Sequence, residues 1–264
     1  MTQPVEKRAH GGAQKGENGA DGNRYGGTEA RTGNRMVLAT IVSVAAATAI
    51  RVPVLSLLLF TAAVFPFFYG ALRRSNHAAA VALVFRWGVA LFFTILVTGA
   101  FLPDRLGAAL PFSGEALRTV ESWIRVPNAP PPADIDYLLW GMVTFLAASL
   151  ASGGLLGLIV AAGAVGAAAY GAVFVFRNGL NLIQIALVAL PVWQLSVLVA
   201  AGFVIVPASV FVFARFFHTE KRAEEWERLR RYMYAGAGFF ALSILLRYAA
   251  AGAWRSLIER WTVH

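Results

Sequence analysis

The chain has 264 residues, of which 58% are hydrophobic and 14% are charged, with a formal net charge of +9 and no cysteine. The charged share is well below the roughly one quarter that is usual in soluble domains, which excludes an ordinary soluble protein. The absence of cysteine excludes disulfides, thiolate metal sites and cysteine nucleophiles. The positive charge does not indicate a nucleic-acid partner, because arginines that border membrane spans produce the same balance.

Residues 1–35 are rich in Gly, Asn, Glu and Arg and contain almost no large apolar side chains. Such a segment cannot bury enough surface to offset the entropy of ordering it, so we expect a disordered polar tail. It also lacks the apolar core of a signal peptide.

Three apolar runs follow within residues 36–102, the first predicted group of transmembrane helices. Arg51 and Pro53 separate the first two runs, which predicts a helical hairpin with a tight turn. Arg73 and Arg74 precede the third run. Residues 103–136 then form a polar loop, predicted to be extracytoplasmic and to contain an amphipathic helix that lies on the bilayer interface.

The longest apolar stretch, residues 137–217, contains no Asp, Glu, Lys or His. Backbone polar groups that leave water must bond internally, so this central block must be helical and embedded in the membrane. It divides at Ser152-Gly153-Gly154 and again near Asn178, and a third helix meets Pro191. The part beyond Pro191 is either a kinked continuation of this helix or a separate pass.

Small residues stand four apart at two places in the central block: Gly153 with Gly157, and Ala167 with Gly171. This spacing lets helix backbones approach closely, so we predict these glycines to be helix-packing positions.

Residues 218–231 are predicted to form a charged cytoplasmic helix that runs directly into the last span, within residues 232–264. The basic clusters favour a cytoplasmic N-terminus in the plasma (inner) membrane of a bacterium. The predicted fold class is therefore all-α, a polytopic integral membrane helical bundle. It has about seven transmembrane helices, with a range of six to eight, and a disordered N-terminal tail.

Several chemistries are excluded by the composition of the spans. No acidic residue occurs from Ala30 to Pro103 or from Tyr137 to Thr219, whereas proton pumps and many cation-coupled transporters rely on intramembrane carboxylates. The histidines lie in tails or at span borders, so we expect no metal and no cofactor. No acid–base pair is available to activate a nucleophile, so we expect no enzymatic activity.

Arg86 stands well inside the third predicted span, roughly 18 Å from Arg74 at about 1.5 Å per residue. An intramembrane arginine is a functional candidate, and no carboxylate in these spans can pair with it. Its partner would be a backbone carbonyl, an amide side chain, an anionic lipid, an anionic solute or an acid on another subunit. The alternative is a structural arginine that reaches an interface. Arg247 lies nearer the end of its span and is expected to snorkel.

Asn181, Gln184 and Pro191 share one helix face, with Asn178 before them and Gln194 after them. Amides in hydrocarbon must find partners, so this amide stripe faces protein or water. Interhelical hydrogen bonding is the favoured interpretation, and the lining of a binding or permeation path is the alternative.

These observations favour a non-catalytic subunit or scaffold of a membrane complex, surrounded by the lipid bilayer and bound to a partner membrane subunit or to another copy of itself. The alternative is a permease or channel-like transporter of an anionic or neutral solute or lipid, with Arg86 and Gln184 lining the path. A continuous polar cavity that joins Arg86 to the amide stripe would favour the transporter.

Overall fold

The computed structural model describes residues 18–111, 113–115, 118, 135–177, 192–217 and 222–262. Within this part of the chain every regular element is an α-helix. The helices are α1 (Asn18–Ile50), α2 (Pro53–Arg73), α3 (His77–Phe101), α4 (Pro103–Ala109), α6 (Ile135–Ala151), α7 (Leu155–Arg177), α9 (Val192–Phe217) and α10 (Arg222–Thr262).

Six of the described helices contain an apolar segment long enough to cross a membrane, namely α1, α2, α3, α7, α9 and α10. The remaining predicted span, α6, has 17 residues, and its apolar part is Leu139–Ala151. At about 1.5 Å per residue, α6 is about 25 Å long, slightly less than a bilayer core of about 30 Å. The predicted all-α membrane fold is confirmed with six helices of spanning length, and the seventh predicted span is a shorter helix.

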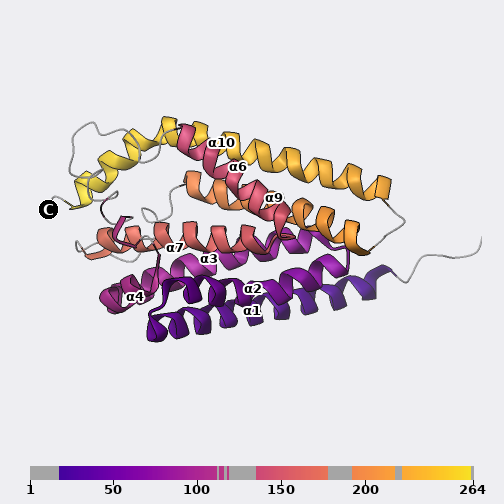
Figure 1. Ribbon diagram of the computed structural model, residues 1–264, viewed down its shortest axis with the longest axis horizontal. Helices are drawn as coiled ribbons and strands as arrows, with labels where there is room; N and C mark the ends of the chain where they lie inside the picture. The colour runs from indigo at the N-terminus through magenta and orange to yellow at the C-terminus, as the bar shows by residue number, and fades with distance from the viewer. Residues whose placement is uncertain are drawn as a thin grey trace, which may run out of the picture.

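The long helices lie along the long axis of the molecule (Figure 1). α3 is the central helix, because it contacts α1, α2, α4, α7 and α9. α10 lies at the edge of the bundle and packs mainly on α9. The beginning of α1 and the end of α10 lie at opposite ends of the bundle (Figure 1).

The predicted hairpin between the first two spans is confirmed. α1 ends at Ile50, Arg51 adopts a positive φ of 58°, and α2 begins at Pro53. Proline suits the first position of a helix because the N–H it lacks would have no intrahelical partner there. At the other end of α2, Asn76 caps α3, with its side chain accepting a hydrogen bond of 3.0 Å from the N–H of Ala79.

The N-terminus differs from the prediction. Residues 18–35 were expected to be disordered, but α1 begins at Asn18 and runs through them without a break. Extending an existing helix costs far less than nucleating one, so the buried apolar half of α1 can carry the helix back into this polar stretch. Residues 1–17 lie outside the described residues.

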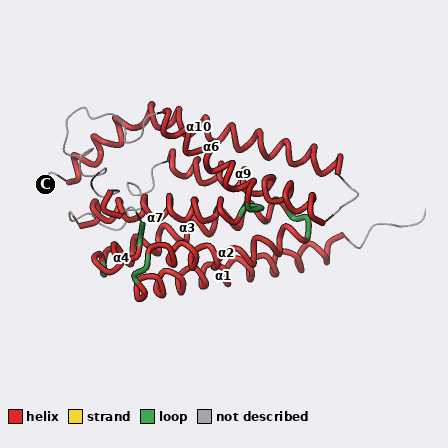
Figure 2. Tube along the Cα trace, viewed as in Figure 1, coloured by secondary structure: helices red, strands yellow, loops and turns green. Residues whose placement is uncertain are grey.

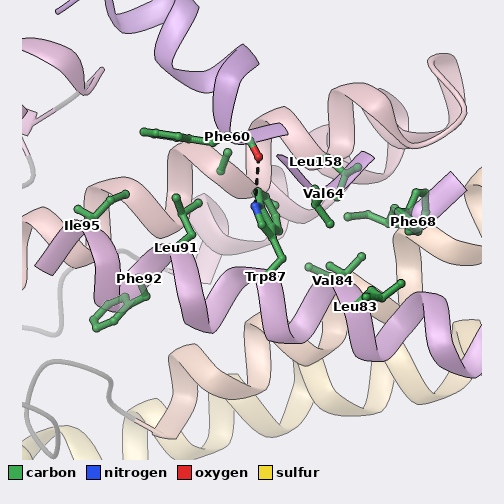
Figure 3. Packing of buried hydrophobic residues seen from close by; sticks show 14 of the residues in the cluster. Phe60, Val64, Phe68, Leu83, Val84, Trp87, Leu91, Phe92, Ile95 and Leu158 are labelled. Atoms are coloured by element: carbon green, nitrogen blue, oxygen red, sulfur yellow. Dashed lines mark hydrogen bonds between the residues drawn. The ribbon is translucent and has the colours of Figure 1, made fainter. Parts of the chain in front are cut away.

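The core is apolar and is centred on Trp87 of α3, which is fully buried (Figure 3). Phe60 and Phe68 of α2, Leu91 of α3 and Leu158 of α7 pack in the same cluster. A buried indole N–H needs a hydrogen-bond acceptor. Nε1 of Trp87 donates a hydrogen bond of 3.1 Å to the backbone oxygen of Phe60.

The predicted charged helix does run directly into the last span, because α10 is continuous over 41 residues. The apolar segment of α10 is Trp226–Ser256. In the most apolar stretch of this segment, 22% of the residues are buried inside the protein, compared with 61% for α9. α10 is therefore the spanning helix with the least contact inside this chain.

The loop after α3 begins with α4, which the sequence did not predict. The hydroxyl of Tyr170 on α7 donates to the backbone oxygen of Pro103 at 3.0 Å and holds α4 against the bundle. Most of the predicted interfacial helix within residues 103–136 lies outside the described residues.

Candidate functional site

Arg86 is exposed on α3, and its guanidinium lies against the polar beginning of α1. A Cβ atom added to Gly33 would lie 3.0 Å from Nη1 of Arg86, so the guanidinium packs closely against the backbone of α1 at this glycine. Gly33 shortly precedes Met36, a fully buried apolar residue of α1. The charge of Arg86 is thus carried toward the polar end of α1, which is the geometry of a snorkelling arginine.

Arg247 points into the protein rather than along its surface. It is 9% exposed, and its Nε is buried without a hydrogen-bond partner among the described residues. It shares the buried face of α10 with Leu229, Gly236, Ser243 and Ala251, which stand at helical spacing and face α9. A buried guanidinium nitrogen without a hydrogen-bond partner is costly, so Arg247 becomes a stronger candidate than the sequence indicated.

The predicted amide stripe is described only in part. Asn178, Asn181 and Gln184 lie outside the described residues, whereas Gln194 is half-buried in the first turn of α9. Its neighbour Trp193 contacts Trp254 of α10, with ring centroids 5.3 Å apart. Since Trp254 lies two turns beyond Arg247 on the same face, Gln194 and Arg247 belong to the same part of the α9–α10 contact. Arg86, on α3, is not part of it.

Two of the three predicted packing glycines lie at the turn between α6 and α7 or one turn after it. Gly153 has φ 59° and Gly154 has φ 91°, in the left-handed region that favours glycine. The N–H of Gly154 bonds to the backbone oxygen of Ser149 at 2.8 Å, which ends α6 with a Schellman motif. A Cβ at Gly157 would collide with Oγ of Ser149, so α6 and α7 approach closely there. The third glycine, Gly171, is buried in α7.

The α6–α7 turn packs against α9 instead of standing free at the end of the bundle. A Cβ at Gly153 would meet Val212 and Phe213, and one at Gly154 would meet Oγ of Ser209. Figure 2 shows this turn, in green, farther from the right-hand end of the bundle than the turn between α2 and α3. Irregular backbone at such a position is tolerated because protein covers it.

Three serine hydroxyls gather around this turn, and each is held by its own helix. Ser149 donates to Phe145, Ser152 to Ala148 and Ser209 to Ile205, each at 2.7 Å from the acceptor oxygen. Ser152 also accepts a hydrogen bond of 2.8 Å from the N–H of Leu156 at the start of α7. These hydroxyls stabilise the turn and show none of the pairing with a base that activates a nucleophile.

A groove of about 300 Å³, which we did not predict, opens between α3, α9 and α10. We call it the α3–α9 groove. Its lining is almost wholly apolar: Ala78, Val81, Ala82, Phe85, Val199, Phe203 and Tyr232. At one end, the ring of His77 stands edge-on to that of Tyr232, with centroids 6.3 Å apart. The spacing of the four α3 residues, at helical intervals of three and four, is the signal that could have predicted this face.

The side of α10 that faces away from α9 carries mainly small residues, with Leu245 at its centre. We call Gly238, Ala241, Leu245, Ala249 and Gly252 the outer face of α10, and all five are exposed. A Cβ atom added to either glycine would meet no other atom within 4 Å. The backbone of α10 is therefore open to close approach from outside the chain.

Comparison with protein-family models, curated proteins and solved structures found no match to this chain. Among the described residues, no three His, Asp or Glu side chains come together as a metal site. Six apolar helices of spanning length indicate a membrane protein.

Proposed function

We propose that the protein is a non-catalytic subunit or scaffold of a membrane complex, and that the outer face of α10 binds a transmembrane helix of its partner subunit. The observation that carries this proposal is the small burial of α10, 22% in its most apolar stretch, together with the open backbone at Gly238 and Gly252. Helices associate in lipid where small residues let their backbones approach.

The two glycines of this face need an explanation, because glycine inside a helix is about 1 kcal/mol less favourable than alanine. Several glycines inside the bundle make room for a neighbouring helix, whereas Gly70 and Gly141 are open like the two on this face. Gly236, two residues before Gly238, would bring a Cβ to 3.1 Å from Val204 and to 3.4 Å from the backbone oxygen of Ala200. Gly238 and Gly252 have no such neighbour among the described residues, and a partner helix would supply one.

The competing proposal is a permease or channel-like transporter. The exposed position of Arg86, beside Gly33 of α1, favours the subunit, because a residue that lines a path should face the interior of the bundle. The absence of catalysis also remains part of our proposal, supported by the serine hydroxyls bound to carbonyls around the α6–α7 turn.

We place the protein in the plasma (inner) membrane with the beginning of α1 in the cytoplasm. Arg73, Arg74 and Arg228 are exposed at the ends of α2 and α10 that would then be cytoplasmic, as the distribution of basic residues in membrane proteins favours.

The test compares the wild type with the Gly238→Leu/Gly252→Leu variant in native membranes. Because the chain has no cysteine, Leu245→Cys can be added to both as the sole thiol for cross-linking to neighbouring chains. We expect one adduct of defined mass in the wild-type background and its loss in the double variant. A Cβ atom at either position meets no described atom within 4 Å, so the melting temperature should be retained.

Gly141→Leu is the matched control, because Gly141 is also exposed and open but lies on α6. It should leave the adduct unchanged. A protein that stays uncross-linked and monomeric in the wild-type background would overturn the proposal, as would an adduct that survives both leucine substitutions. An adduct with the mass of two copies would identify the partner as a second copy of this chain.

A further inference from the structure

The α3–α9 groove runs along the helix axes, which is the direction of a lipid acyl chain. Ala78, Val81, Ala82 and Phe85 line roughly 10 Å of α3 at about 1.5 Å per residue. Val199 and Phe203 of α9 form the opposite wall, and none of these six side chains offers a polar group. An apolar groove of this shape suits a hydrocarbon chain better than a polar solute.

One end of the groove is basic. Arg74 lies in the turn between α2 and α3, four residues before Ala78 in the chain. Arg228 stands one turn before Tyr232 on the same side of α10. Both arginines are exposed. Glu227, the nearest acid whose side chain the structure describes, pairs with Arg230 at 3.0 Å and with Arg231 at 3.9 Å rather than with Arg228.

We propose that the α3–α9 groove holds one acyl chain of an anionic phospholipid, whose phosphate is bound by Arg74 and Arg228. Arginine is well suited to a phosphate because its planar guanidinium donates two parallel hydrogen bonds. The apolar groove suits the acyl chain, and the basic end suits the phosphate. In a bilayer the phosphate likewise lies at the surface and the acyl chain lies inside. Anionic lipids are concentrated in the leaflet that basic residues near a membrane face.

Arg86 supplies the natural control, because it is an exposed arginine on α3, the helix that forms one wall of the groove. It directly follows Phe85 in the chain, but its guanidinium lies beside Gly33 of α1. If the basic end of the groove binds the phosphate, removing the charge of Arg86 leaves the groove lipid in place.

The experiment is native mass spectrometry of the full chain in detergent, titrated with dioleoyl-phosphatidylglycerol or with dioleoyl-phosphatidylcholine. The wild type should bind one phosphatidylglycerol more tightly than phosphatidylcholine. Arg74→Gln/Arg228→Gln should weaken phosphatidylglycerol about tenfold, in line with the loss of charge-assisted hydrogen bonds. Ala82→Trp fills the groove and should reduce binding of both lipids, whereas Arg86→Gln should bind as the wild type does.

Other outcomes would overturn the assignment. Equal affinity of the wild type for the two lipids would contradict the proposed binding of an anionic lipid by Arg74 and Arg228. The preference for phosphatidylglycerol could instead be lost in Arg86→Gln and kept in Arg74→Gln/Arg228→Gln. This result would show that the lipid phosphate binds beside α1. Unchanged binding in Ala82→Trp would show that no chain occupies the groove. A protein subunit that co-purifies with the wild type and is lost in Ala82→Trp would replace the lipid as its occupant.

Discussion

The indole nitrogen of Trp87 on α3 donates a hydrogen bond of 3.1 Å to the backbone oxygen of Phe60 on α2 (Figure 3). Both side chains are fully buried. Because a carbonyl oxygen accepts two hydrogen bonds, this contact ties the central helix to its neighbour without opening α2.

Trp87→Phe should lower the free energy of unfolding by about 1–3 kcal/mol, from the lost hydrogen bond and the space left by the smaller ring. Thermal unfolding in detergent measures the change. Trp140→Phe is the control, because Trp140 is 72% exposed on α6 and its replacement should change the free energy by less than about 0.5 kcal/mol. Equal shifts for the two variants would contradict the role given to Trp87.

Gly154→Ala should destabilise the protein by about 1–3 kcal/mol, because an alanine at φ 91° is strained and its Cβ collides with Ser209. Adding Ser209→Ala should restore the stability lost to the collision, but not the stability lost to backbone strain. Gly70→Ala on α2, where a Cβ meets nothing within 4 Å, should be neutral or stabilising. Chemical denaturation of the four proteins separates these contributions.

Gly88 of α3 packs tightly against Leu198 of α9, where a Cβ on Gly88 would lie 2.5 Å from Cδ1 of Leu198. We expect Gly88→Val and Leu198→Ala each to destabilise the protein, by overpacking and by a cavity respectively. The double variant should be more stable, by about 0.5–3 kcal/mol, than the sum of the two single changes in unfolding free energy predicts. Gly88→Val combined with Leu106→Ala, on the distant α4, should be additive. Additivity in both pairs would contradict the contact.

Arg247→Met should raise the melting temperature of the isolated protein, because it removes a buried charge whose Nε has no partner among the described residues. Removing such a group is expected to stabilise by roughly 1–3 kcal/mol. Arg86→Met, at an exposed position, should have little effect. A lower melting temperature for Arg247→Met would show instead that Arg247 is a structural residue.

The helices were predictable because hydrophobic length and Gly or Pro interruptions are read directly from the chain. The turns at Arg51 and at Gly153 lie where these interruptions placed them. The helical state of residues 18–35 was not predictable from their composition, since it depends on propagation from the buried half of α1.

Residue environments were harder to predict than helices. Gly236 and Gly238 are the same residue type in one apolar run, yet one packs on α9 and the other is open. Arg247 was expected to snorkel and is instead buried, because its spacing from Ser243 places it on the inner face of α10. Hydropathy measures how apolar a run is, but the direction of each side chain depends on which neighbour the helix meets.

The unbroken course of α10 has a mechanical consequence. Its 41 residues extend about 60 Å at about 1.5 Å per residue, twice a bilayer core of about 30 Å. The stretch from Arg228 to Arg247 is helical throughout and packs on α9, whereas the end of α10 changes direction (Figure 1). A displacement of the charged beginning of α10 would therefore reach Arg247 through unbroken helical backbone, over about 28 Å at about 1.5 Å per residue.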